Sequence, residues 1–198
     1  MKAKIRLILF LFLSGILHVS IAQQGTKTDQ LMKEQNRNWK EVVENDLNML
    51  GHRNWILVVD KAFPEQSTPG MKYLYIEQEL LPTMEYLLQL LDQSTHIRPV
   101  IYRDQELEFI TESQVKGIAA FKAAARQVLG DRPIETLLHE DVFSLLDESA
   151  ELFKVLVIKT NTVLPYTSFF LQLDCAYWGP EQETILREKM KRELKARE

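Results

Sequence analysis

The stretch Trp55-Ile56-Leu57-Val58-Val59 decides the fold class. All five residues are apolar, and a short continuous run of this kind predicts a β-strand that is buried on both faces, as in the sheets of α/β proteins. Asp60 follows directly, so it lies at the carboxyl end of the strand, where open α/β sheets tend to bind ligands. An aspartate in this position also has a structural interpretation, because it can accept hydrogen bonds from the amides of a turn.

Helical and β-rich segments alternate along the chain on both sides of this strand. Thr111-Glu112-Ser113-Gln114 is a capping-box pattern, and it precedes a predicted helix through Ile118 to Gly130. Further segments are assigned from apolar spacing: helices over 30–50, 82–92 and 142–152, and strands over 98–102, 155–160 and 167–174. Such alternation predicts an α/β domain of three layers.

The tail that follows Gly179-Pro180 is almost wholly charged. Leu186, Met190 and Leu194 recur at intervals of four, which predicts a solvent-exposed helix over residues 181–198 with one narrow apolar stripe. We find no internal repeat and no interdomain linker. The sequence therefore predicts one α/β domain over residues 30–180 with an additional helix at each end.

Residues 1–22 have the pattern of a secretory signal peptide, and residues 23–29 that of a flexible leader. Lys2, Lys4 and Arg6 precede an apolar run from Leu7 to Leu17, and small residues occupy the cleavage-site spacing at Ser20-Ile21-Ala22. An uncleaved membrane anchor is the alternative, but the run is shorter than the roughly 20 residues that span a bilayer. The pattern predicts an exported protein, periplasmic or secreted, with no membrane attachment after cleavage.

Composition narrows the function classes. The 198 residues are 45% hydrophobic and 26% charged, which is typical of a globular protein. Loss of residues 1–22 removes three basic and no acidic residues from the 24 Lys and Arg and 28 Asp and Glu, and leaves a net charge of −7. An acidic exported protein is a poor candidate for binding nucleic acid. A single cysteine, Cys175, excludes a disulfide framework and zinc sites built on cysteine pairs.

Taken singly, the candidate functional residues have equally good structural interpretations. His52 precedes the first strand, and His139 precedes two acidic residues that suit the first turn of a helix. Tyr166 could be a hairpin aromatic, and Lys61 and Lys159 could be surface charges. The sequence contains no glycine-rich phosphate loop, nucleophile elbow or zinc-protease motif.

In order along the chain, these residues resemble a known family. The block from Leu50 to Pro64, LGHRNWILVVDKAFP, is similar to the opening signature of the D-ribose pyranase and L-fucose mutarotase (RbsD/FucU) family: Gly-His, an apolar strand, an Asp eight residues after the His, and a Pro four further on. Val157-Ile158-Lys159-Thr160 and Pro165-Tyr166-Thr167-Ser168 are similar to its second signature. The resemblance spans roughly residues 47–173.

The resemblance implies a cofactor-free, metal-free enzyme that interconverts monosaccharide anomers or ring forms by general acid–base catalysis. It implies His52 as the main acid or base, His139 as a second proton carrier, and Asp60 and Tyr166 as partners of the sugar or of an imidazole. Substrate binding would involve three further side chains: Ser168, Lys61 and Lys159. It also implies an RbsD/FucU-type fold and a ring-like homo-oligomer with the site between subunits, where His52 could come from the neighbour.

Two departures leave a second hypothesis open. Ser168 stands where the family has Asn, and Thr160-Asn161-Thr162 replaces its Gly-Glu. These changes favour an exported carbohydrate-binding protein of the same fold without turnover. A third possibility is an interaction protein whose terminal helices form the functional surface.

Overall fold

The computed structural model describes residues 39–196. The predicted signal peptide and leader therefore lie outside the described residues. The chain divides into two units, Met1–Val43 and Glu44–Glu198. The described residues of the first unit, 39–43, are helical, and the second unit begins with helical residues 44–47. All that follows concerns the second unit.

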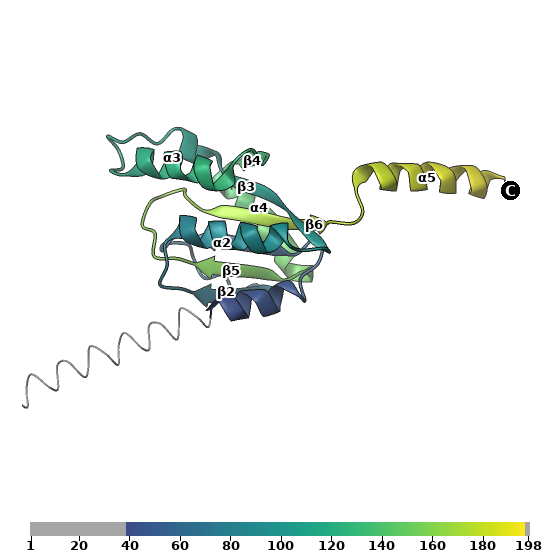
Figure 1. Ribbon diagram of the computed structural model, residues 1–198, viewed down its shortest axis with the longest axis horizontal. Helices are drawn as coiled ribbons and strands as arrows, with labels where there is room; N and C mark the ends of the chain where they lie inside the picture. The colour runs from purple at the N-terminus through teal and green to yellow at the C-terminus, as the bar shows by residue number, and fades with distance from the viewer. Residues whose placement is uncertain (1–38, 197–198) are drawn as a thin grey trace, which may run out of the picture. The chain divides into compact units, whose positions relative to one another are not determined.

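A six-stranded mixed sheet forms the centre of this unit (Figure 1). The strand order is β2-β5-β1-β6-β3-β4. The strands are β1 (Trp55–Val59), β2 (Met71–Tyr75), β3 (Ile97–Asp104), β4 (Ile134–Leu137), β5 (Val155–Lys159) and β6 (Phe169–Cys175). All five residues of β1 are buried, which confirms the prediction of a strand covered on both faces.

The direction of the strands brings several chain segments to one edge. β1 runs parallel to β5, and β3 runs parallel to β4. β6 lies between these pairs and is antiparallel to both β1 and β3, with Phe169 opposite Val58 and Arg103. The carboxyl ends of β1, β3 and β4 therefore meet the beginning of β6 on the same side of the sheet. This line of strand ends is the edge at which the candidate site lies, and it is distinct from the outer strands β2 and β4.

Helices cover both faces of the sheet, which confirms the three-layer α/β class. The helices beside the sheet are α2 (Leu80–Asp92), α3 (Ile118–Leu129) and α4 (His139–Leu152). The charged tail forms α5 (Pro180–Lys195). Val142 and Leu146 of α4 pack in one buried cluster with Leu57 and Phe170. Phe169, the neighbour of Phe170, instead lines a cavity with residues of α3. Because successive strand residues face opposite sides, α3 and α4 lie on opposite faces, and α2 packs beside α3.

The helix predicted through Ile118 to Gly130 is confirmed, but the capping-box pattern that precedes it does not cap it. The Gln114 side chain does accept the Thr111 N–H at 2.8 Å, as in a capping box, but it closes only a local turn. Gly117, with φ of +91°, ends that turn, and α3 begins at Ile118. The Glu112 carboxylate then accepts the N–H groups of Gly117 and Ala119, and these two bonds lower the pKa of Glu112.

Two further features complete the fold. β2 and β4 were not predicted as strands, because both lie at an edge of the sheet, have half-buried or exposed residues, and lack a continuous apolar run. The C-terminal helix was predicted correctly, and none of its residues is buried. Within residues 39–196, no helix is both long and apolar enough to cross a membrane.

Candidate functional site

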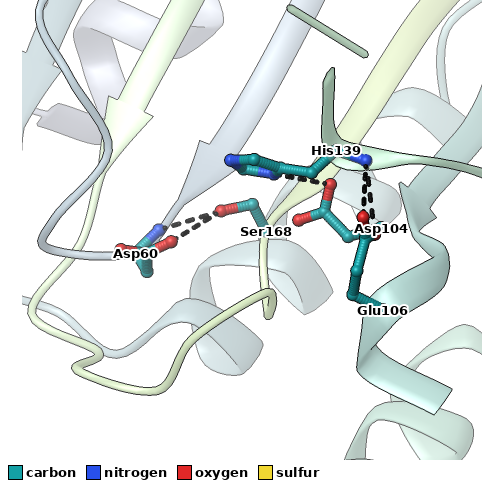
Figure 2. A network of polar contacts seen from close by, with 5 residues as sticks. All are labelled: Asp60, Asp104, Glu106, His139 and Ser168. Carbon is teal, nitrogen blue, oxygen red and sulfur yellow. Dashed lines mark hydrogen bonds and ion pairs between the residues drawn. The ribbon is translucent and has the colours of Figure 1, made fainter. Parts of the chain in front are cut away.

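Four polar side chains gather where the carboxyl ends of β1, β3 and β4 meet the start of β6. Asp60 follows β1, Asp104 ends β3, and His139 begins α4 directly after β4. Ser168 immediately precedes β6 and completes the group (Figure 2). These residues are up to 108 positions apart in sequence, and only the strand order brings them together.

Asp60 and Ser168 form a two-way pair. The Ser168 hydroxyl donates to Asp60 Oδ2 at 3.1 Å, and it accepts the backbone N–H of Asp60 at 3.2 Å. The other carboxylate oxygen, Oδ1, accepts the N–H of Ala62 at 2.8 Å, so Asp60 also stabilises the turn after β1. The structure thus agrees with both interpretations of Asp60, the structural and the functional one. The carboxylate closes a turn, and it lies at the edge of the sheet where α/β proteins tend to bind ligands.

Asp104 and His139 form the second pair. His139 Nδ1 lies 3.0 Å from Asp104 Oδ1, and Asp104 is completely buried. Burial raises the pKa of Asp104; the bond to His139 opposes this rise, and the nearby charges of Glu106 and Asp60 add to it. Asp60 is the weakest of these influences, and it lies near enough to Asp104 to act on its carboxyl group.

His139 is held in position from several sides. The backbone N–H of His139 donates to the Glu106 carboxylate at 3.1 and 3.2 Å (Figure 2). The ring stands edge-on to Phe143 at 4.8 Å and to Tyr166 at 5.2 Å between centroids. With Nδ1 directed to Asp104, Nε2 has no hydrogen-bond partner among residues 39–196. This nitrogen is free to exchange a proton with a ligand.

Tyr166 joins the site from a tight turn. Its backbone has φ of +55°, in the left-handed region that a non-glycine residue adopts infrequently, and its side chain is 37% exposed. The Thr167 hydroxyl donates to Leu164 O at 2.7 Å and fixes this turn. The phenol is therefore presented to solvent beside the imidazole of His139.

His52 lies elsewhere. His52 precedes β1 and Asp60 follows β1. The five extended residues of the strand, about 16 Å in length, therefore lie between them. His52 is exposed, and its charge acts on Asp174, near the other end of β6 from Ser168. Within one copy of the chain, the predicted meeting of His52 with Asp60 and Tyr166 does not occur.

The two lysines differ in their roles. Lys61 Nζ donates to Tyr75 Oη at 2.5 Å and to Asn161 Oδ1 at 2.9 Å, on the exposed surface next to Asp60. Lys159 Nζ donates to the backbone carbonyl of Phe63 at 2.7 Å and thereby fastens the loop that follows β1. Lys61 remains available to a ligand, whereas Lys159 acts on the backbone.

A cavity of about 380 Å³ adjoins the site. Asp60, Lys61 and Ala62 line one side of it, and the loop of Val163, Leu164 and Pro165 lines the other. Small-molecule sites have volumes of roughly 300–1,000 Å³, so the space is sufficient for a monosaccharide. Among residues 39–196 no group of three or more His, Cys, Asp or Glu side chains is placed to hold a metal ion.

Asp104 and Glu106 were not identified from the sequence. The strand that carries Asp104 was predicted to end at Tyr102, two residues too early. The same rule that identified Asp60, a carboxylate at the carboxyl end of a buried strand, applies to Asp104 once the strand is extended.

Comparisons with solved structures find proteins of similar fold. The chain is similar to Bacillus subtilis RbsD complexed with D-ribose, with 22% identity, a TM-score of 0.45, and coverage of 66% of this chain and 88% of that one. It is similar to the fucose mutarotase from Streptococcus pneumoniae in complex with L-fucose, with 17% identity, a TM-score of 0.46, and coverage of 65% and 87%. For FucU from Bifidobacterium longum the identity is 14%, the TM-score 0.43, and the coverage 67% and 92%. No protein-family model and no curated protein sequence matches the chain.

Proposed function

We propose that the protein is a cofactor-free monosaccharide mutarotase or pyranase, which interconverts sugar anomers or ring forms by general acid–base catalysis. The convergence of Asp60, His139, Tyr166 and Ser168 at one edge of the sheet carries this proposal. The resemblance of the blocks around His52 and Tyr166 to the RbsD/FucU signatures supports it independently.

The chemistry requires two proton transfers and no redox step. One group removes the proton from the anomeric hydroxyl, while another protonates the ring oxygen, so that the ring C–O bond breaks and the open-chain aldehyde forms. Rotation of the aldehyde and reclosure give the other anomer, and closure by a different hydroxyl gives the other ring size. Positioned acids and bases accelerate such steps typically by 10²–10⁴-fold.

His139 is the proposed base on this side of the sugar. Its free Nε2 accepts the hydroxyl proton, and the buried Asp104 carboxylate stabilises the positive charge that then develops at Nδ1. Tyr166 is the proposed donor toward the ring or a hydroxyl oxygen. Asp60 and Lys61 line the adjoining cavity and would bind the remaining hydroxyls.

His52 completes the proposed mechanism only if the site lies between two copies of the chain. His52 is exposed at the opposite end of β1 from the site of its own chain. Its imidazole would reach the site of a neighbouring subunit more directly. We therefore include a homo-oligomer with a shared site in the proposal, and export through the N-terminal signal sequence as its setting.

A sugar-binding protein without turnover is the second candidate, and one observation favours it. The Ser168 hydroxyl is already engaged with both the carboxylate and the N–H of Asp60, so it offers a sugar less than a longer amide side chain would. Binding would then rest on Asp60, Lys61 and Tyr166, and turnover would be lost.

Exchange NMR on a panel of aldoses separates the two candidates. An enzyme, added at substoichiometric amounts, raises the rate of magnetisation transfer between anomers or ring forms of at least one sugar. A binding protein shifts sugar resonances in proportion to its concentration and leaves the exchange rate unchanged. If no sugar shows either effect, the proposal is wrong.

A further inference from the structure

A second cavity lies on the other side of the sheet from the candidate site. It has a volume of about 420 Å³ and is bounded by α3, the short 3-10 helix Gln105–Glu108, and strands β3, β4 and β6. Arg103 and Phe169 line it, whereas their sequence neighbours Asp104 and Ser168 belong to the candidate site. Because adjacent strand residues face opposite sides, the two locations share strands but no side chains.

Apolar side chains form most of the inner wall of this cavity. Leu107, Leu129 and Phe169 line it and are buried, and Ile134 of β4 is half-buried there. A cavity of this size with apolar walls and few polar groups has the usual character of a small-molecule site. The walls require a ligand whose body is apolar.

The polar groups of the cavity are mainly cationic. Three basic side chains, Arg103, Lys122 and Arg126, line it together with one carboxylate, Glu108, which leaves two positive charges in excess. Arg103 Nη2 donates to Glu108 Oε1 at 2.5 Å. Clustered charge of one sign beside an apolar wall raises the local concentration of the opposite ion, here in a chain whose own net charge is −4.

Much of this donor capacity is unused by the protein. Arg103 Nε is buried and has no acceptor among residues 39–196. Lys122 Nζ donates only to the carbonyl oxygens of Glu108 and Ile110, at 3.1 and 2.6 Å, so no carboxylate in the described part of the chain neutralises it. A buried charged donor without an acceptor costs free energy, and a ligand oxygen that accepts from it would remove this cost.

We infer that this cavity binds a small organic acid, with its carboxylate at Arg103, Lys122 and Arg126 and its apolar body against Leu107, Leu129 and Ile134. A guanidinium matches the planar geometry of a carboxylate through paired N–H groups. The inference does not depend on the proposed sugar chemistry, because the candidate site lies on the opposite face.

Octanoate is a suitable probe for this site, and isothermal titration calorimetry measures its binding to the full chain. We expect saturable one-to-one binding, with octanol (the same body without charge) and acetate (the same head without the body) each binding at least tenfold more weakly. Equal binding of octanol and octanoate would overturn the inference, as would the absence of saturable octanoate binding at millimolar concentration.

Arginine variants locate the bound probe. Arg126 is exposed and unpaired within residues 39–196, so Arg126→Gln is expected to fold normally and to weaken octanoate binding about tenfold. Arg187→Gln removes the same charge from α5, outside the cavity, and serves as the matched control with unchanged binding. If both variants bind octanoate as tightly as the original chain, the acid does not occupy this cavity and the inference fails.

Discussion

His139 has one ring nitrogen fixed and one free. Asp104 holds Nδ1 at 3.0 Å, so the ring cannot turn without breaking this contact, and the Glu106 carboxylate separately holds the backbone N–H. Glutamine keeps a polar side chain of similar length but cannot exchange a proton. We expect His139→Gln to reduce catalysed sugar exchange by 10²–10⁴-fold, as measured by saturation-transfer NMR.

The matched control is Glu140→Gln, the next residue on α4. Glu140 is exposed, and no role at the site is assigned to it, so its loss should leave the exchange rate unchanged. If His139→Gln retains full exchange while it still binds sugar, His139 is not the proton carrier.

Asp104 gives a second prediction at this scale, on stability rather than rate. Burial raises its pKa in the folded protein above the ordinary value of 3.8. The folded state therefore holds this proton more tightly than the unfolded chain, and the stability contributed by Asp104 falls as the pH rises through the interval above 3.8. Asp104→Asn removes this dependence. The variant should be more stable relative to the original chain at pH 7 than at pH 3.

Urea unfolding at the two pH values measures this difference. The comparison uses each protein against itself, so any cost of the substitution that does not vary with pH cancels. A relative stability of Asp104→Asn that is higher at pH 3 than at pH 7 would contradict the assignment of a burial-raised pKa.

Candidate residues could be identified from the sequence where a strand end was placed correctly. Asp60 follows five apolar residues and was therefore found, whereas Asp104 is the last residue of a strand with an irregular burial pattern, and that strand was predicted to end at Tyr102. The pairing of Ser168 with Asp60 could not be predicted, because it depends on β6 lying next to β1.

At the scale of elements, Gly70 joins β2 to the end of α4. Its N–H donates to Ala150 O at 3.0 Å, and its carbonyl accepts the N–H of Val155. A Cβ at this position would lie 2.2 Å from the backbone oxygens of both Ala150 and Phe153. We expect Gly70→Ala to destabilise the protein by about 3 kcal/mol, because backbone atoms have to move apart. Thermal and urea unfolding measure this loss.

Gly51 provides the control for that substitution. A Cβ added there meets nothing within 4 Å, and its φ is not in the left-handed region. Gly51→Ala is therefore expected to change stability by less than about 0.5 kcal/mol. Equal effects of the two substitutions would mean that the close approach at Gly70 does not exist.

The elements that sequence analysis placed correctly are those with strong apolar patterns, such as β1, β5 and α2. The failures have separate physical causes. β2 and β4 carry half-buried and exposed residues at the two edges of the sheet, and the turn closed by the Thr111 pattern ends at Gly117, whose φ is positive. The position at a sheet edge decided the first outcome, and the backbone conformation of Gly117 decided the second.

For the whole molecule, strand order determines what lies close together. His52 and Asp60 are eight residues apart in the sequence, yet they lie at opposite ends of β1. His139 and Tyr166 are 27 residues apart, and their rings are in contact. The three-layer class followed from the alternation of segments, but the order β2-β5-β1-β6-β3-β4 has no local signal and could not be predicted.

The position of His52 at the far end of β1 has a consequence for mixtures of variants. If a neighbouring copy supplies this imidazole, His52→Ala and His139→Gln chains are each inactive alone, but mixed oligomers contain some sites with both histidines intact. Unfolding and refolding the two variants together in equal amounts should restore about one quarter of the original exchange rate. A site is intact when one chain supplies His139 and its neighbour supplies His52, and each of these two conditions is met with a chance of about one in two. Two defective chains would thus repair each other, which no site contained within a single copy allows.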